Sequence, residues 1–363
     1  EVIIDTRNSF VIAGTHGKTT TTSMMAWVCE NVGLSPGFLI GGIPKNFSKS
    51  FQTPNANTFV IEGDEYDTAY FDKVPKFIHY KPKNVILTSV EFDHADIYSD
   101  FAAVKSAFFK LTALIPKEAG SLVYWGDDIH VCEIANTYNG VKKLSYGFGN
   151  SCDCVAQITS DSEPKTQCEV FFKGTSLGSY SLGLSGRFNV LNATAVVAQA
   201  HLNGFDLKKT QNALAEFQGV KRRQEILGEY GGVLVIEDFA HHPTAVKETV
   251  LAIQKRYSPR RVFSVFEPRS ATSRRKVFQN DYVEAFSKAQ EVLIAKAFDR
   301  FSSEDLVNDL VKMNKSAQVF ASADEIVSNL AARAKKTDVI LIMSNGGFDG
   351  IYEKLISALK TKL

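Results

Sequence analysis

The stretch VIAGTHGKTTTT at residues 11–22 constrains this chain more than any other feature, because it joins an apolar strand to a helix through a glycine-containing loop. Phe10–Ala13 has the apolar composition of a strand, and Lys18–Asn31 has the pattern of a helix. Such a loop points backbone N–H groups and the positive end of the helix dipole at an anion. The sequence therefore predicts a phosphate site at a strand-to-helix turn.

The loop also supplies most of the candidate nucleotide ligands. Gly-Lys-Thr at residues 17–19 ends like a P-loop, whereas Ile12 stands where the strict pattern has its first glycine. The lysine of such a loop reaches the outer phosphates, and the threonine hydroxyl binds Mg²⁺. The alternative is a plain helix start with a surface lysine. The predicted nucleotide-binding residues of the loop are Gly14, Thr15, His16, Gly17, Lys18, Thr19 and Thr20.

An acidic residue and a histidine follow two further predicted strands. Glu62 comes directly after Thr58–Ile61, and His94 comes after Asn84–Val90. Ligands collect outside the carboxyl ends of strands in open α/β sheets. A triphosphate needs a hard cation, so we expect Glu62 and Thr19 to serve one magnesium ion and His94 to help hold a second.

The same two segments permit a simpler interpretation. Glu62, Asp64 and Glu65 could form a solvated acidic turn, and His94 could pack at the surface. The phosphate loop favours the metal site, because a bound triphosphate would need that cation nearby.

The rest of the chain alternates short apolar strands with helices. This alternation predicts an α/β protein with mainly parallel sheets: a P-loop domain over residues 1–224 and a Rossmann-like domain over residues 225–363. Cys152–Leu184 lacks helix signals and predicts a small antiparallel meander, and the charged stretch 219–232 predicts a linker. Further strands are expected at Val233–Ile236, Val262–Phe266, Val292–Ala295 and Val339–Met343, and further helices at Phe101–Ile115, Asn189–Asn203 and Thr244–Tyr257.

Composition argues against several classes of protein. The formal net charge is +1 with basic residues spread along the chain, which does not favour a nucleic-acid partner. No apolar run approaches the ~20 residues of a membrane span, and nothing at the start resembles a signal peptide. The five cysteines lack zinc-type spacing, so we expect reduced thiols in a cytoplasmic protein.

Six motifs occur in the order found in the Mur ligases, and the chain resembles that family over essentially its whole length: GTHGKTTT, EGDEYD, EFDHADIY, GRFNVLNA, GVKRR and EDFAHHPT. The resemblance implies an ATP-dependent, amide-forming enzyme of bacterial cell-wall synthesis. The histidine of the loop points to the muramate-activating branch. The segments GGIPKNF, EYDTAYFDKVPKFIHY, FEPRS and MSNGGFDGIYEKL are similar to members that join UDP-N-acetylmuramate to the recycled tripeptide L-alanyl-γ-D-glutamyl-meso-diaminopimelate.

The resemblance also implies roles for individual residues. Asn189 and Asn192 contact the nucleotide, with Asn192 at the adenine, and Arg223 and Asp238 reach ATP from the second domain. An ordinary helix cap is the alternative for Asn189, and solvated charge is the alternative for Arg223. The implied catalytic residues are Lys18, Glu62 and His94, and the implied Mg²⁺ ligands are Thr19, Glu62 and His94.

The peptide carries negative D-glutamyl and diaminopimelate carboxylates, which arginine and backbone amides bind well. Arg269 follows the strand Val262–Phe266 and is the expected carboxylate clamp. Arg274 and Arg275 either assist it or are surface charge. The predicted peptide-binding residues are Arg269, Ser270, Ser344, Asn345 and Gly346.

Departures from the family pattern bear on selectivity and on domain content. Phe108 stands where some Mur ligases carry a carbamoylated lysine, so none is expected. A UDP-sugar-binding domain of about a hundred residues should precede the phosphate loop, and only ten residues do so here. Unexpected residues also stand at Gly63, Ala271, Asp349 and Tyr352.

Three alternatives to the tripeptide ligase are left open by the motifs. The L-alanine-adding ligase of the same branch is the nearest, although FEPRS and MSNGGF argue against it. The second is a P-loop ATPase that uses nucleotide for motion and ligates nothing. The third is a fragment that binds ATP and peptide without joining them.

Overall fold

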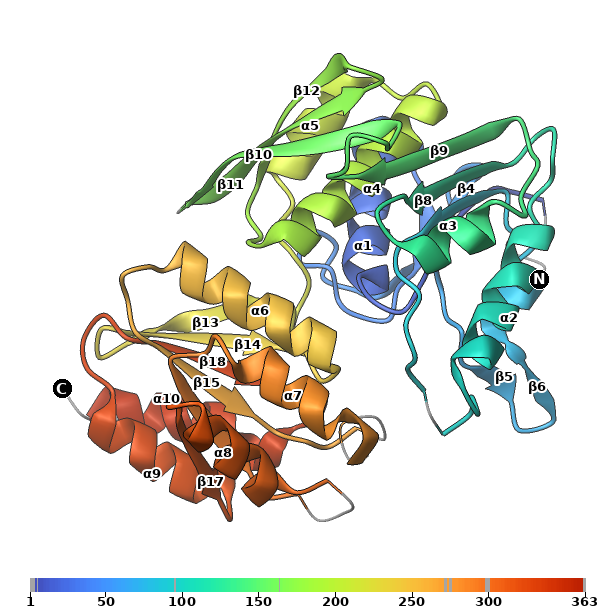
Figure 1. Cartoon of the computed structure of the whole chain (residues 1–363). Coiled ribbons are helices and arrows are strands. Elements are labelled where there is room, and N and C mark those ends of the chain that lie inside the picture. The colour runs from blue at the N-terminus through green and yellow to red at the C-terminus, as the bar shows by residue number, and fades with distance from the viewer. Residues whose placement is uncertain are drawn as a thin grey trace. The chain divides into compact units, whose positions relative to one another are not determined.

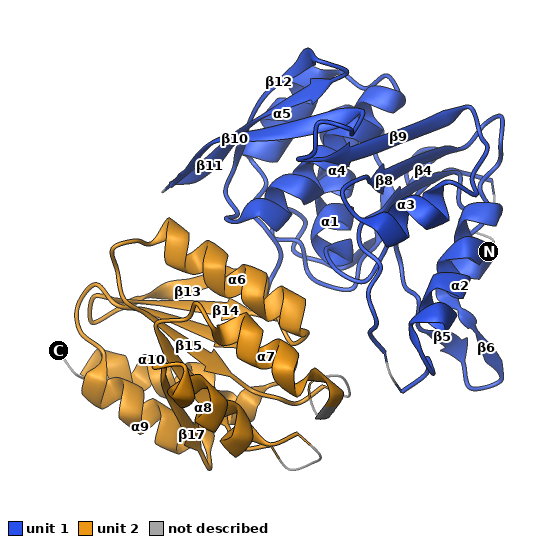
Figure 2. Cartoon of the chain, in the orientation of Figure 1, with its two compact units in different colours: residues 1–221 blue, residues 222–363 orange. Residues whose placement is uncertain are grey.

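The structure is a computed structural model that describes Ile4, residues 6–94, 96–162, 164–270, Ser273, residues 276–297 and residues 301–361. The chain divides into two compact units, Glu1–Lys221 and Arg222–Leu363 (Figure 2). The boundary expected from the sequence lay after residue 224. Among the described residues, no helix has both the length and the apolar character that crossing a bilayer requires.

A ten-stranded sheet forms the centre of the first unit (Figure 1). Its strand order is β12-β11-β10-β9-β8-β7-β1-β4-β2-β3, and the strands from β10 to β2 run parallel. The predicted meander is confirmed as β10–β12, and it extends the main sheet. The strands are β1 (Asn8–Ala13), β2 (Gly37–Leu39), β3 (Phe51–Gln52), β4 (Thr58–Gly63), β7 (Asn84–Leu87), β8 (Ser121–Trp125), β9 (Lys142–Gly147), β10 (Cys154–Ser162), β11 (Lys165–Phe172) and β12 (Thr175–Leu182), with a separate hairpin of β5 (Asp67–Ala69) and β6 (Asp72–Pro75).

Helices cover both faces of this sheet. Phe10 and Ile12 of β1 face a core shared with α1 and α4, whereas Val11 and Ala13 face a core shared with α2 and α3. Burial on both faces explains the unbroken apolar sequence of this strand. The helices are α1 (Lys18–Asn31), α2 (Phe101–Ala113), α3 (Ile129–Ala135), α4 (Arg187–Leu202) and α5 (Leu207–Ala215), with a 3₁₀ turn η1 (Lys76–Tyr80).

One predicted strand of the first unit is too long. β7 ends at Leu87, whereas the sequence predicted a strand to Val90. The chain leaves the sheet because Thr88 turns onto the phosphate loop, where its Oγ1 donates to Ala13 O (3.1 Å) and His16 O (2.6 Å). The early exit places the segment that carries His94 beside that loop.

The second unit is built on a six-stranded sheet with the order β13-β14-β18-β15-β16-β17. All neighbours pair in parallel except β13, which pairs antiparallel with β14. β13 lies inside 219–232, so the prediction of a linker there is wrong for these six residues. Charged residues are common in edge strands, and here they made the strand resemble a linker. The strands are β13 (Glu225–Tyr230), β14 (Val233–Asp238), β15 (Val262–Phe266), β16 (Glu291–Ala295), β17 (Ser316–Phe320) and β18 (Val339–Met343).

The second sheet is also covered on both faces. Val233 and Val235 of β14 face a core with α9 and α10, while Phe266 of β15 contacts Tyr282 and Phe286 of α7 at ring-centroid distances of 5.2 and 5.5 Å. Because β14, β18, β15, β16 and β17 run parallel, their carboxyl ends lie at one edge of this sheet. The helices are α6 (Pro243–Arg256), α7 (Gln279–Phe286), α8 (Ser303–Lys312), α9 (Ala323–Arg333) and α10 (Ile351–Thr361), with 3₁₀ turns η2 (Lys276–Phe278) and η3 (Phe348–Gly350).

Candidate nucleotide and peptide sites

Two glycines give the loop between β1 and α1 its shape. Gly14 and Gly17 have φ values of 129° and 83°, which disfavour other residues. A Cβ atom on Gly14 would lie 2.2 Å from Thr88 Oγ1, and one on Gly17 would lie 2.5 Å from Asn192 Oδ1. The loop backbone is therefore in close contact with the turn after β7 and with α4.

The first turn of α1 is suited to an anion. Gly17 is the N-cap residue, and among the described residues no side chain caps the helix. Lys18, Thr19 and Thr20 thus present first-turn N–H groups that a phosphate can satisfy. Both threonines are buried, so their backbone is fixed by packing.

Thr15 and His16 tie the loop to the segment after β7. Thr15 N–H donates to Ser89 O (2.7 Å), and Thr15 Oγ1 accepts from Glu91 N–H (2.9 Å). His16 N–H donates to Ser89 Oγ (2.9 Å), and its Nε2 lies 3.4 Å from Glu91 Oε2. These contacts explain why a histidine stands inside the loop. A contact between His16 and the nucleotide stays a prediction.

The structure brings together two of the three predicted magnesium ligands. Glu62 of β4 is in register with Ile12 of β1, so its side chain reaches the start of α1. Thr19 Oγ1 donates to Glu62 Oε1 (2.9 Å), and Gly41 N–H donates to Glu62 Oε2 (2.8 Å). This set of hydroxyl and carboxylate oxygens is the kind that Mg²⁺ prefers.

His94, the third predicted ligand, lies on Glu65. His94 Nε2 is 3.1 Å from Glu65 Oε1, and Lys18 Nζ is 2.8 Å from each Glu65 oxygen. Lys18 also donates to Gly14 O (2.6 Å) and Thr15 O (3.3 Å). The ammonium group is therefore held over the loop by one buried carboxylate and two carbonyl oxygens.

Electrostatics in this cluster are dominated by burial and by Glu65. Burial by itself lowers the pKa of Lys18, but the neighbouring carboxylates of Glu65, Glu62 and Asp64, of which Glu65 acts most strongly, together outweigh it and the pKa is raised. The pKa of His94 is raised in the same way, with burial opposed by the hydrogen bond to Glu65. Both groups are thus held in their charged forms to higher pH.

The two predicted asparagines lie at the start of α4. Asn189 Nδ2 donates to Ser185 O (2.8 Å), and Asn192 Nδ2 donates to Asn189 Oδ1 (3.3 Å). Both are buried, and Asn192 lies against Gly17 of the phosphate loop. Their position fits a nucleotide-binding role, and the contact of Asn192 with adenine stays a prediction.

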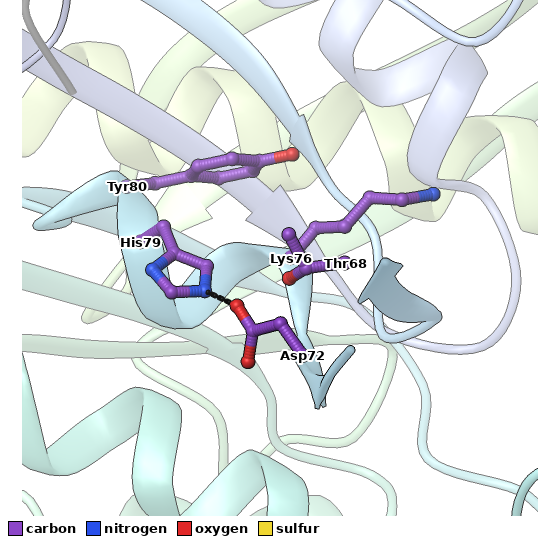
Figure 3. Close-up of a pocket in the computed structure, with 5 residues that line it drawn as sticks. All are labelled: Thr68, Asp72, Lys76, His79 and Tyr80. Carbon is purple, nitrogen blue, oxygen red and sulfur yellow. Dashed lines mark hydrogen bonds and ion pairs between the residues drawn. The ribbon is translucent and has the colours of Figure 1, made fainter. Parts of the chain in front are cut away.

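A hollow of about 360 Å³ in the first unit is lined by Thr68, Asp72, Lys76, His79 and Tyr80 (Figure 3). His79 Nε2 lies 2.7 Å from Asp72 Oδ2, and Lys76 pairs with Asp64. Burial raises the pKa of Tyr80 to about 12, with the carboxylates of Asp64 and Glu62 adding to the effect. No predicted site residue lines this hollow.

In the second unit, Arg222 joins the ends of β14 and β18. Its Nε donates to Glu237 Oε1 (2.7 Å), and its Nη2 donates to Ser344 O (2.9 Å) and Gly346 O (2.6 Å). Two of the predicted peptide-binding residues are thus held through their carbonyl oxygens by an arginine that the sequence analysis passed over.

Asp238 and Arg223, the predicted nucleotide contacts of this unit, lie near each other. Asp238 is buried and accepts from Ala240 N–H (2.7 Å) and Gln224 N–H (2.8 Å). Burial raises its pKa, opposed by Arg223 and the two N–H groups. The guanidinium of Arg223 lies 4.6 Å from the ring centroid of Phe239.

Arg269, Ser344 and Gly346 come together at the ends of β15 and β18. Arg269 Nη1 is 3.9 Å from Glu267 Oε1, and a Cβ on Gly346 would lie 2.6 Å from Arg269 Cδ. Ser344 Oγ donates to Glu267 Oε2 and accepts from Gly346 N–H (2.9 Å). Asn345 Oδ1 is buried and has no hydrogen-bond partner among the described residues.

The structure does not join every predicted residue to these groups. Ser270 Oγ donates to Ser273 Oγ (2.8 Å), so this serine is engaged in its own turn. Ala271, Arg274 and Arg275 lie outside the described residues. Phe108 is buried against Phe77, with ring centroids 5.8 Å apart.

Sequence reasoning missed Glu65, Arg222 and Glu267 as parts of these clusters. Glu65 was weighed only as part of a solvated turn, yet its side chain is 2% exposed. Arg222 stands next to the favoured Arg223, and Glu267 stands at the end of a predicted strand, as Glu62 does. Position directly after a strand was therefore a usable signal for Glu267.

Both units match domain models of known protein families. Residues 12–200 match the Mur ligase middle domain, and residues 222–346 match the Mur ligase, glutamate ligase domain. A UDP-N-acetylmuramate–L-alanyl-γ-D-glutamyl-meso-2,6-diaminoheptandioate ligase from Haemophilus influenzae is 37% identical over 362 residues, which cover 97% of this chain and 76% of that relative.

Two further relatives are informative. A UDP-N-acetylmuramate–L-alanine ligase from Carboxydothermus hydrogenoformans is 30% identical over 98% of this chain and 75% of that relative. The crystal structure of a murein peptide ligase from Psychrobacter arcticus 273-4 aligns with a TM-score of 0.70 and 32% identity, over 99% of this chain and 78% of that one.

Proposed function

The chain belongs to the Mur ligase family, and we propose that it joins UDP-N-acetylmuramate to the tripeptide L-alanyl-γ-D-glutamyl-meso-diaminopimelate while ATP is split to ADP and phosphate. It is thus an ATP-dependent ligase that forms an amide bond. The reaction returns a cell-wall peptide to a sugar-nucleotide precursor, and we place it in the cytoplasm, where ATP is supplied.

The observation that carries the proposal is the cluster of Lys18, Thr19, Glu62, Glu65 and His94 at a helix start that no side chain caps among the described residues; Thr19 and Glu65 are buried, and the other three are partly buried. A positive loop beside paired carboxylates suits transfer of a phosphoryl group through charge stabilisation. The identity of 37% to the tripeptide ligase, against 30% to the alanine ligase, favours the tripeptide as acceptor.

The residues present suit a magnesium ion. Thr19 and Glu62 already place a hydroxyl and a carboxylate oxygen 2.9 Å apart next to the phosphate loop, and Mg²⁺ is usually bound through one or two carboxylates together with substrate phosphates. We propose Thr19 and Glu62 for one ion and His94 for a second. When bound, the metal neutralises charge on the phosphates of ATP.

The first step makes the muramoyl carboxylate reactive. One carboxylate oxygen attacks the γ-phosphorus of ATP, the bond to the bridging oxygen breaks, ADP leaves, and an acyl phosphate forms. Lys18 and the N–H groups of Thr19 and Thr20 stabilise the charge that spreads over the transferring phosphoryl group. Among the described residues no serine or cysteine is needed as nucleophile, because the activated acid itself is attacked.

The second step forms the amide. The neutral amine of the peptide attacks the acyl carbon, the carbon–oxygen bond breaks, inorganic phosphate leaves with that oxygen, and the nitrogen gives up one proton to the departing phosphate. We propose that Arg269 holds a peptide carboxylate, with Ser344, Asn345 and Gly346 supplying further hydrogen bonds and Ser270 beside them. Arg223, Asp238, Asn189 and Asn192 are proposed to contact the nucleotide.

Direct reconstitution tests this function. The full-length protein is incubated with UDP-N-acetylmuramate, ATP, Mg²⁺ and the tripeptide, and products are read by mass spectrometry. We expect ADP and the amide-linked UDP-N-acetylmuramoyl tripeptide in equal amounts. ADP without coupled product would instead indicate a P-loop ATPase.

Free L-alanine offered in place of the tripeptide separates the nearest alternative. We expect much slower product formation with L-alanine, because it lacks the D-glutamyl and diaminopimelate carboxylates, one of which Arg269 is proposed to bind. A higher kcat/KM for L-alanine would assign the chain to the alanine-adding ligases.

A further inference from the structure

Glu65 occupies a place that the reaction described above leaves without a role. Its side chain is 2% exposed; Oε1 takes part in hydrogen bonds, whereas Oε2 has only an ion-pair contact with Lys18 and no hydrogen-bond partner among the described residues. Oε1 contacts Lys18 Nζ (2.8 Å) and His94 Nε2 (3.1 Å), and Oε2 contacts Lys18 Nζ (2.8 Å). One carboxylate therefore links the proposed phosphate-binding cation to the proposed metal-binding imidazole.

The position of Glu65 is itself fixed. Its carbonyl oxygen accepts a hydrogen bond from Tyr98 OH (2.6 Å), which anchors the backbone after β4. A buried carboxylate with two cationic neighbours costs a large desolvation penalty and is stable only while those neighbours stay in place. The three side chains thus form one unit whose geometry depends on each member.

His94 is fixed both through its backbone and through two contacts of its ring. Its backbone N–H donates to Asp93 Oδ1 (2.8 Å), and its φ of 51° turns the side chain toward the cluster. Tyr66 meets the ring edge-on with centroids 4.9 Å apart. The Nε2 atom of the ring lies against the Glu65 carboxylate. A carboxylate at one ring nitrogen fixes which nitrogen carries the proton.

We propose that Glu65 is a positioning residue that accepts the Nε2–H of His94, leaves Nδ1 as the metal-binding nitrogen, and keeps Lys18 over the phosphate loop until a phosphate replaces it. The inference rests on the proposed function, because it assigns Glu65 to the metal and phosphate sites of that reaction. It adds a residue and a specific tautomer to them.

The proposal predicts effects of opposite sign on two ligands. Glu65 competes with phosphate for Lys18, so its removal strengthens binding of metal-free ATP. Glu65 also orients His94, so its removal weakens binding of a metal ion, and loss of such a supporting carboxylate typically costs 10- to 100-fold in affinity. A residue that merely supports the fold would weaken both.

The test compares Glu65→Ala with the wild-type protein and with Asp64→Ala as a matched control. Asp64 is the neighbouring carboxylate and pairs with Lys76, so its removal makes the same change of charge without removing a contact to Lys18 or His94. Mn²⁺ binding without nucleotide is measured by paramagnetic resonance, and ATP binding without metal by calorimetry. We expect Glu65→Ala to lose about tenfold in Mn²⁺ affinity and to gain roughly tenfold in ATP affinity, with little change in Asp64→Ala.

Nitrogen-15 spectra of the histidine side chains report the tautomer directly. At alkaline pH, where the ring is neutral, the wild-type signal of His94 should show a protonated Nε2, and Glu65→Ala should show a mixture. The signal is assigned with His94→Gln. A wild-type ring protonated at Nδ1, or equal losses of both ligands in Glu65→Ala, would overturn the proposal.

Glu65→Asp covers the case in which the alanine variant does not fold. It keeps the charge but is one methylene shorter, so it cannot reach Lys18 and His94 together and should still lose Mn²⁺ affinity. Wild-type tautomer and affinity in this variant would also overturn the proposal. If the wild-type protein has no ligase activity while the Glu65 variants still show these changes in affinity and tautomer, only the proposed function is rejected.

Discussion

The two candidate sites differ in how far they are assembled within their own units. In the first unit the central ion pair is largely shielded from solvent, since the side chain of Lys18 is 12% exposed and that of Glu65 is 2% exposed. In the second unit the main candidate, Arg269, is 57% exposed and lies 3.9 Å from Glu267. The proposed phosphoryl transfer thus uses charges that are already fixed by pairing, whereas the proposed recognition of the peptide uses an exposed arginine at a strand end.

Replacing Lys18 by alanine gives the largest expected effect. The variant removes the ammonium group that we propose to stabilise the transferring phosphoryl group, so kcat should fall about 10³-fold. ADP release is measured at saturating ATP.

Lys76→Ala is the control for this change, because it removes an ammonium of the same unit that pairs with Asp64. We expect it to keep near-normal turnover. Full turnover in Lys18→Ala would break the comparison, because the rigid loop would then carry no chemistry.

Replacing Arg269 by alanine comes next. Loss of a charge-assisted hydrogen bond should raise KM for the tripeptide about 10- to 100-fold and leave KM for ATP unchanged. Lys296→Ala, which removes a half-exposed ammonium paired with Glu304, is the control. Equal changes in the KM values for ATP and for the tripeptide would indicate that Arg269, Ser344 and Gly346 do not form a separate peptide site.

The loop glycine offers a sharper test of rigidity. Gly17 and Gly174 have φ values of 83° and 82°, but a Cβ would meet Asn192 Oδ1 at 2.5 Å in the first case and nothing within 4 Å in the second. Gly17→Ala should therefore lower the free energy of unfolding by about 2–3 kcal/mol, and Gly174→Ala by about 1 kcal/mol. Urea unfolding measures both, and equal losses would show that the loop is not tightly enclosed.

The pH dependence of metal binding should show the smallest effect. The pKa of His94 is raised by Glu65, so the ring keeps its proton above the ordinary value of about 6.5. A metal ligand must be neutral, so Mn²⁺ affinity should fall as the pH drops through that raised pKa, by up to about tenfold per unit. His94→Ala should lose this dependence, and a flat wild-type profile would exclude His94 as a ligand.

Much of the scaffold was predictable because its signals are local. α1 has the predicted bounds, Lys18–Asn31, and the strand β15 has the predicted bounds, Val262–Phe266. The pairing of Thr19 with Glu62 followed from strand ends that meet at one edge of a parallel sheet. Apolar periodicity and a loop with glycines were sufficient for these predictions.

The missing parts depend on contacts between distant residues. EGDEYD offers four carboxylates, and only the path of the chain after β4 turns Glu65 inward to Lys18. In GVKRR, Arg222 adopts a φ of 63°. This backbone angle interrupts the regular alternation of side-chain directions, so the sequence does not predict which of the two arginines faces the strand ends. Edge strand β13 was hidden because its charged residues resemble a linker.

One isotope experiment tests the central claim, that the phosphate loop activates a carboxylate for attack by an amine. UDP-N-acetylmuramate labelled with oxygen-18 in its carboxylate is incubated with ATP, Mg²⁺, the tripeptide and the full-length protein, and the released phosphate is analysed by mass spectrometry. The account predicts one labelled oxygen in each phosphate and the other in the new amide. Unlabelled phosphate alongside a labelled amide product would contradict an acyl phosphate and the mechanism built on it.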